Sequence, residues 1–330
     1  MKTVSRKLIA VAAFALGLTA APSRAADVEK LLPAETEQVF QLNIKQILES
    51  DLVKKYALAQ IKQALAGNEA QKTLQALGMD PLKDIDSLTG GVWGDDPKDL
   101  KAVIIVRGKF DAEKLFEAAK AAAKKDGDKV SIVTEGDYTL VKVTVENRPE
   151  PLYLTVADDK TVLLATDKKL VVTAMKAADD KSAKPQLKKD LIALIEQMDG
   201  KASMFACGVS SGKVGEIPPN PLFDDVDKLK KQLEKLKSSA MTLRVTTDVS
   251  IEVIMSMKDG DAAEDFGGTV DELLGKAKAF LPFIAMQNAN MKPIIGDVTK
   301  SLKSKVDKND VKMTLKLTGD SIGKAAGTDD

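Results

Sequence analysis

The chain has 330 residues, 44% of them hydrophobic and 30% charged, with 49 basic side chains, 49 acidic side chains and no histidine. This composition is that of a folded globular protein and excludes a disordered or collagen-like chain. Only 4% of the residues are aromatic, and the cations are almost all lysine, which argues against nucleic-acid binding.

The N-terminus has the pattern of a secretory signal peptide. Lys2, Arg6 and Lys7 precede an apolar run at 8–18, and Ala25 ends a small-residue motif suited to signal peptidase. Cleavage after Ala25 would leave 305 residues with a net charge near −4, because residues 1–25 carry four basic side chains and no acid. No later apolar stretch has the roughly 20 residues needed to span a bilayer. We therefore expect a periplasmic or extracellular protein that does not span the membrane.

In the first half, strand and helix patterns lead into a run of four strands. Apolar–polar alternation predicts a strand at 39–44, and helical spacing predicts a helix at 46–66. The glycine-containing stretch 80–99 is expected to be loop or short strand. A strand at 102–106 precedes an alanine-rich helix that Asp111 caps. Further strands are expected at 130–134, 138–145, 152–156 and 161–165, followed by a helix at 168–178.

The second half follows a polar segment at 181–185, which predicts a boundary between domains at 26–183 and 184–330. Its predicted elements are a helix at 186–198, strands at 202–209, 241–246, 250–257 and 311–317, a helix at 224–238, and a helical region at 262–306 broken at Pro282 and Pro293. This order is that of a split βαβ unit. We expect an α+β fold of antiparallel sheets with helices on one face, and an internal duplication of two related halves.

Both ends of the chain resemble a known group of proteins. Residues 32–36 (Leu-Pro-Ala-Glu-Thr) lead into a strand just after the signal peptide, and residues 308–317 form the closing strand. In these features the chain resembles uncharacterised secreted proteins of planctomycete-type bacteria and related periplasmic families. The resemblance implies export and an α+β fold, and it brings no functional residue.

Few side chains suited to catalysis are present. Without histidine, Cys207 cannot form a Cys–His pair, and we expect it to be a buried strand residue. The segment 210–213 (Ser-Ser-Gly-Lys) has neither a second motif for a Ser–Lys dyad nor the spacing of a phosphate loop. We expect that the protein is not an enzyme and that it has no catalytic residue and no cofactor. A glycoside hydrolase using two carboxylates, about 5–10 Å apart, is kept as an alternative.

Acidic residues cluster where turns and helix starts are predicted. The clusters are at 95–99, 158–159, 179–180, 224–227 and 259–261. Aspartate is favoured there for capping and turn formation. The Asp-Gly-Asp segments at 126–128 and 259–261 lack the later oxygen ligands and closing glutamate of a calcium loop. We therefore expect no metal site.

Two apolar features indicate possible binding sites. Trp93, among the glycines of 90–94, would serve as a ligand platform or close the rim of the core. The second feature is a bent helix with an apolar face. This face would either form a groove for a lipid or a partner or pack in the core, and its residues are Phe280, Phe283, Ile284, Met286 and Met291. We expect an exported non-enzymatic binding protein or envelope-associated structural protein. The alternative is a periplasmic carrier of a lipid or other apolar ligand.

Overall fold

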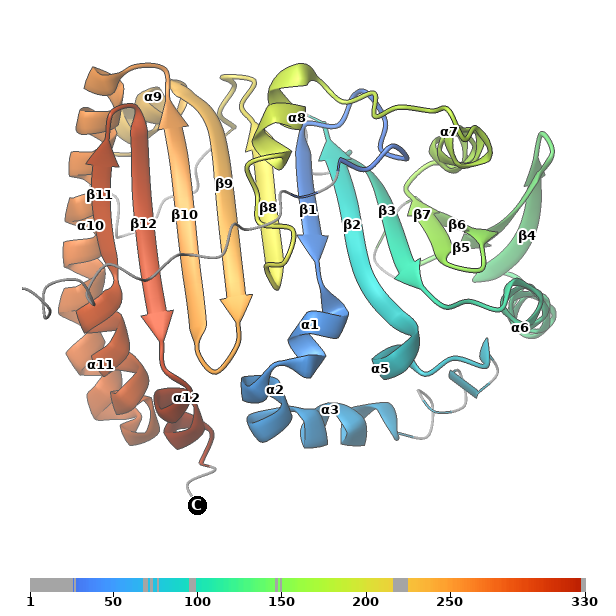
Figure 1. Cartoon of the computed structure of the whole chain (residues 1–330), viewed down its shortest axis with the longest axis horizontal. Coiled ribbons are helices and arrows are strands. Elements are labelled where there is room, and N and C mark those ends of the chain that lie inside the picture. Colours follow the sequence, from blue (N-terminus) through green and yellow to red (C-terminus); the bar gives the residue numbers. More distant parts are fainter. Residues whose placement is uncertain are drawn as a thin grey trace, which may run out of the picture.

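The computed structural model describes residues 26, 28–67, 71, 74–75, 77–94, 99–145, 148, 150–215 and 225–327. The signal-peptide pattern, the prolines at 218, 219 and 221, and three acids of the predicted clusters (Asp95, Asp96 and Asp224) lie outside the described residues. Within the described part, a single antiparallel sheet of twelve strands extends through the molecule, flanked by helices (Figure 1). The fold class is therefore α+β, as predicted.

The strands of this sheet pair in one continuous order from one edge to the other. In spatial order they are β11 (Lys303–Asp307), β12 (Asp310–Leu317), β10 (Val249–Met257), β9 (Leu236–Val245), β8 (Met204–Val209), β1 (Gln38–Leu42), β2 (Ile85–Trp93), β3 (Lys101–Gly108), β7 (Thr161–Ala165), β6 (Leu152–Asp158), β5 (Tyr138–Val143) and β4 (Val130–Glu135). Strand β1 of the first half of the chain pairs with β8 of the second half, with Phe40 opposite Ala206. Both halves of the chain thus contribute to one continuous sheet. The domain boundary and the internal duplication stay predictions.

The helices flank the sheet and lie beside the ends of its strands (Figure 1). They are α1 (Ile44–Glu49), α2 (Asp51–Tyr56), α3 (Leu58–Leu65), α5 (Pro81–Asp84), α6 (Ala112–Lys125), α7 (Lys168–Asp179), α8 (Lys189–Ile195), α9 (Val226–Leu233), α10 (Gly260–Gln287), α11 (Lys292–Ser301) and α12 (Gly319–Ala326). The predicted cap of α6 is confirmed, because the carboxylate of Asp111 accepts a hydrogen bond from the Lys114 N–H at 3.1 Å.

The main hydrophobic core lies on one face of the sheet. Val103, Ile105 and Leu163 are fully buried there, packed with residues of α7 and α8 such as Val171 and Leu191. Because neighbouring residues of a strand point to opposite faces, the alternate residues of β3 and β7 face the other way, toward α6. Strands that are apolar at every position need cover on both faces. Helices therefore cover both faces at this end of the sheet, where one face was expected.

The far end of the sheet follows the expectation of helices on one face. There Met257 and Val311 pack against α10, which buries Phe266 and Val270. The opposite face of the same strands carries polar side chains, such as Glu252 on β10. The register across the sheet places α6 and α10 on the same face.

Strand β2 forms where a loop or short strand was expected. Gly90 is required by the neighbouring strand, because a Cβ at this position would lie 2.2 Å from the ring of Phe40 on β1. Glycine in a strand commonly marks such a close approach. Glycines in this stretch predict a loop as readily as a short strand, whereas in the structure Gly90 provides room for packing between strands.

Other differences concern where helices end. The helix expected at 46–66 is divided into α1, α2 and α3. Pro282 does not break α10, which continues to Gln287. The helix expected through 306 ends earlier, and Lys303–Asp307 pairs with β12 as the edge strand β11. Leu236 begins β9 rather than extending the preceding helix. No helix in the described ranges is both long enough and apolar enough to cross a membrane.

Candidate functional site: an apolar cavity beneath helix α6

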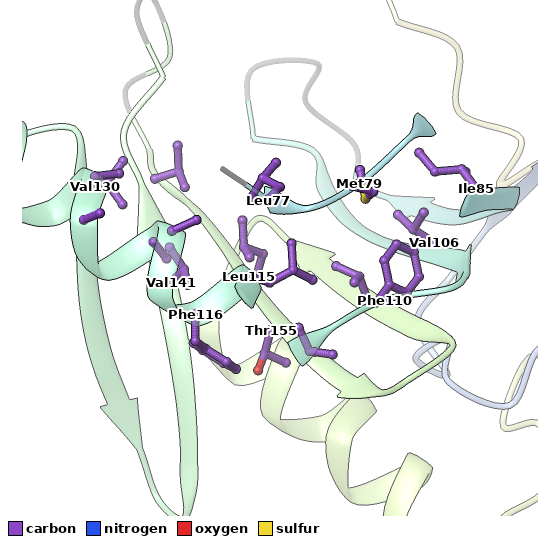
Figure 2. A pocket seen from close by; sticks show the side chains of 18 of the residues that line it. Leu77, Met79, Ile85, Val106, Phe110, Leu115, Phe116, Val130, Val141 and Thr155 are labelled. Carbon is purple, nitrogen blue, oxygen red and sulfur yellow. The ribbon is translucent and has the colours of Figure 1, made fainter. Parts of the chain in front are cut away.

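A cavity of about 740 Å³ lies between α6 and the outer strands of the sheet (Figure 2). Its lining residues are Leu77, Met79, Ile85, Val106, Phe110, Leu115, Phe116, Ala118, Ala119, Ala121, Ala122, Lys125, Val130, Val141, Val143, Leu154, Thr155, Val156 and Val162. All of them except Lys125 and Thr155 are hydrophobic. The volume falls within the roughly 300–1,000 Å³ of small-molecule sites.

The floor of the cavity is built by side chains in register on adjacent strands. Val106 of β3 lies opposite Val162 of β7, and Val162 lies opposite Val156 of β6. Farther along, Leu154 of β6 lies opposite Val141 of β5. Because directly opposite side chains share a face, these residues form one continuous apolar surface beneath the helix.

The roof of the cavity is the inner face of α6. Leu115, Ala118, Ala119 and Ala122 lie on this face at helical spacing and line the cavity. At the distance at which α6 lies from the strands, each alanine contributes only a methyl group, so these positions leave open space above the floor. No residue of α6 is buried.

Helix α10, on the same face of the sheet, packs without such a gap. It buries Ala262, Ala263, Phe266, Gly267 and Val270 against the strands below it. The close approach is possible because Gly267 has no side chain, and a Cβ there would lie 2.3 Å from Val306. The open space beneath α6 is thus specific to that helix and does not follow from the sheet alone.

The two ends of the cavity differ in polarity. One end, at the start of α6, is lined by Leu77, Met79, Ile85 and Phe110, and all four are apolar. The other end lies at the C-terminus of α6, where the Val130 N–H donates to the Asp126 carbonyl at 3.0 Å and Lys125 joins the lining.

The polar groups of the lining differ in their hydrogen bonding. The hydroxyl of Thr155 donates to the Thr139 carbonyl at 2.9 Å, so it is engaged within the protein. Lys125 forms no ion pair with any residue that the structure describes. Within the described part of the lining, its ammonium is therefore the one charge that a bound molecule could pair with.

The residues of the predicted groove lie elsewhere, on the second part of α10 and the turn after it. Phe280 is 59% exposed, Phe283 57%, Ile284 44% and Met286 80%, while Met291 is half-buried. None of the five lines the cavity beneath α6. A groove formed by these residues stays a prediction.

Trp93, the predicted rim aromatic, ends β2 and is partly buried against the main core. Its ring does not line the cavity beneath α6. This packing is compatible with a position at the rim of the core, and both expected roles of Trp93 stay predictions.

The candidates for nucleophilic chemistry are engaged or buried. Cys207 is 4% exposed, and burial raises the pKa of its thiol to about 12. In the segment 210–213, the hydroxyl of Ser210 accepts the Gly212 N–H at 3.1 Å. The hydroxyl of Ser211, the serine two residues before Lys213, accepts the Lys213 N–H at 3.4 Å. Neither arrangement presents an activated nucleophile.

Four described members of the acidic clusters act in caps and turns, as expected. Asp158 and Asp180 accept backbone N–H groups in turns, at 2.8 Å each. Asp225 and Asp259 cap α9 and α10. Asp99 and Asp179 instead accept hydrogen bonds from the side chains of Lys101 and Tyr138. Among the described residues, no group of three or more Cys, Asp or Glu side chains is arranged to hold a metal ion.

The cavity was not predicted from the sequence, although a signal for it exists. The inner positions of α6 carry alanine, while β3 and its neighbours are apolar on both faces. Small inner side chains leave part of the apolar floor uncovered when the helix lies at this distance from the strands, and the tertiary structure sets that distance.

Comparisons with known proteins found no match for the chain among protein-family models, curated proteins or solved structures. The resemblance of the chain ends to secreted proteins of planctomycete-type bacteria stays a prediction. The fold and site define an α+β protein with a ligand-sized apolar cavity, and the function is argued from that cavity.

Proposed function

We propose that the protein binds an apolar ligand in the cavity beneath α6 and acts as an exported carrier of that ligand. The observation that carries this proposal is the cavity of about 740 Å³ whose lining is hydrophobic except for Lys125 and Thr155. A contiguous apolar surface that water can reach commonly marks a site for a ligand or partner.

The driving force for such binding would be the removal of apolar surface from water. Each square ångström buried is worth about 25 cal/mol, before the costs of association. The alanines at 118, 119 and 122 keep the floor accessible, where larger side chains would have closed the space. The chain thus supports a cavity at the expense of packing.

The lining favours binding and release over chemistry. Among the residues that the structure describes, the lining contains no carboxylate and no thiol, and the hydroxyl of Thr155 is hydrogen-bonded to a backbone carbonyl. A glycoside hydrolase would need two carboxylates across a cleft. The signal-peptide pattern at 1–25 supports placing this carrier outside the cytoplasm, where apolar molecules need protection from water.

Fluorescence titration of the purified protein with Nile red, a neutral apolar dye, tests the proposal. We expect saturable enhancement with the unaltered protein. Ala119→Phe, which places a ring inside the cavity, should weaken binding at least tenfold. Ala112→Phe adds the same ring to an exposed position of α6 outside the lining and should leave binding unchanged. Thermal melts would confirm that both variants are folded.

Two results would contradict the proposal: no saturable dye binding by the folded protein, or equal binding by the Ala119→Phe variant. Native mass spectrometry of protein purified without detergent provides a second measurement. We expect excess mass that organic solvent extracts from the unaltered protein and that the Ala119→Phe variant lacks.

A further inference from the structure

We infer that the ligand is an alkyl-chain amphiphile with an anionic headgroup, bound with its tail toward Phe110 and its headgroup beside Lys125. This inference rests on the proposed function, because it names the class of ligand that the same cavity takes. It is carried by the position of Lys125, the charges around it and the apolar character of the opposite end.

Lys125 lies on the inward stripe of α6. Leu115, Ala118, Ala122 and Lys125 follow one another at spacings of three or four residues, so they lie along the same side of the helix. The first three positions are apolar and line the cavity, and the stripe ends in a lysine that also lines it. The preceding residue, Lys124, does not line the cavity.

The structure of a lysine side chain suits the mouth of an apolar cavity. Its methylene stem can lie along apolar surface while the ammonium stays in contact with water. Lys125 is exposed overall and still contributes to the lining, which is the arrangement expected of such a residue. A headgroup at this mouth would meet the ammonium without leaving water completely.

The local charges leave an excess of positive charge at this mouth. The segment from 124 to 129 contains three lysines and two aspartates, Asp126 and Asp128. The Asp126 carboxylate lies 3.6 Å from the ammonium of Lys129, so that pair is largely neutralised. Lys125 has no partner of its own among the described residues. An anionic group would supply one.

At the opposite end of the cavity, the side chains that the structure describes are all apolar. Leu77, Met79, Ile85 and Phe110 close it with hydrocarbon, aromatic and thioether surface. The inward stripe from Leu115 to Lys125 extends over about 15 Å at 1.5 Å per residue. A cavity that is elongated and charged at one end matches a molecule that is elongated and charged at one end.

Displacement of Nile red by dodecanoate and by dodecanol separates the headgroup from the tail. These probes have the same chain length and differ in charge. We expect Lys125→Met, which keeps an unbranched apolar stem, to weaken dodecanoate about fivefold, the size of a solvent-accessible charge pair. The affinity for dodecanol should not change. Lys124→Met removes an adjacent charge outside the lining and should leave both probes unaffected.

The inference is overturned if Lys125→Met leaves dodecanoate binding unchanged, or if it weakens both probes equally. It is also overturned if Lys124→Met reproduces the effect, because overall charge would then explain it. Failure of the proposed function has a different signature, since Nile red itself would then not bind. Binding of the dye without a charge effect would preserve the carrier and exclude the anionic headgroup.

Discussion

The guanidinium of Arg107 donates a hydrogen bond to the carboxylate of Glu29 at 2.7 Å, which ties the N-terminal segment to strand β3. The same guanidinium donates to the Thr161 hydroxyl on β7 at 2.6 Å. Arg244 on β9 forms a comparable ion pair at 3.0 Å with Asp199, just before β8. Each of these arginines thus holds the segment that leads into a central strand.

Glu29→Gln should lower stability by about 1 kcal/mol, because it removes the charge from a partly buried ion pair and leaves Arg107 without its partner. Thermal unfolding should show a Tm decrease of about 2 °C. Glu35→Gln neutralises an exposed acid in the same segment and is the control. Equal effects of the two substitutions would contradict a specific role for the Arg107–Glu29 pair.

Two adjacent glycines of α10 should respond in opposite directions to alanine. Gly267→Ala should destabilise by about 1–3 kcal/mol, because the new Cβ would lie 2.3 Å from Val306. Gly268 is exposed with no atom near its Cβ position, so Gly268→Ala should stabilise the helix by up to about 1 kcal/mol. Denaturant unfolding of both variants measures the difference. A neutral Gly267→Ala would show that α10 is not seated tightly on β11.

Asp248 should contribute to stability that is lost in acid. Its hydrogen bond with Lys316, at 2.8 Å, and the Gly319 N–H, at 3.0 Å, lower the pKa of its carboxyl below 3.8. A carboxyl with a lowered folded-state pKa stabilises the protein above the unfolded-state value, and the contribution disappears as pH falls through the folded-state pKa.

Asp248→Asn should therefore reduce the Tm by a few degrees at pH 7, and the difference from the unaltered protein should shrink as the pH falls below 3.8 and the carboxyl becomes protonated. Melting curves across this range test the expectation. A difference that stays constant with pH would mean that the carboxylate charge is not responsible.

Cys207 should be unreactive in the folded protein. Burial raises the pKa of its thiol to about 12, so the reactive thiolate is scarce at neutral pH, and the side chain is almost inaccessible. A thiol-reactive dye should label the protein only after denaturant is added. Rapid labelling under native conditions would show that β8 opens, since Cys207 lies on that strand beside β1.

Local patterns in the sequence predicted the elements whose signal is unambiguous. The strands at 138–145 and 161–165 and the cap at Asp111 were found close to their predicted positions. The edge strand β11 was not predicted, and the glycine-containing β2 was expected only as a loop or short strand, because the structure of both depends on neighbouring strands. For Gly90, the decisive contact is with Phe40, fifty residues away in the chain.

The candidate site was less accessible to prediction than the fold. The sequence directed attention to the apolar side chains at 280–286, which are exposed on α10. The cavity instead gathers residues from 77 to 162, among them four alanines that carry no binding signal by themselves. A cavity is an absence of atoms, and hydrophobic patterning reports where apolar residues occur without reporting how closely they pack.

Composition and periodicity by themselves determined the α+β class, most of the elements and the scarcity of groups for histidine or thiol chemistry. Only the tertiary structure decided that both halves share one sheet, that α10 is seated on it and that α6 stands off from it. The physical reason is that strand pairing and the depth of helix packing depend on contacts between distant residues. The position of Lys125 at the mouth of the cavity follows from that packing alone.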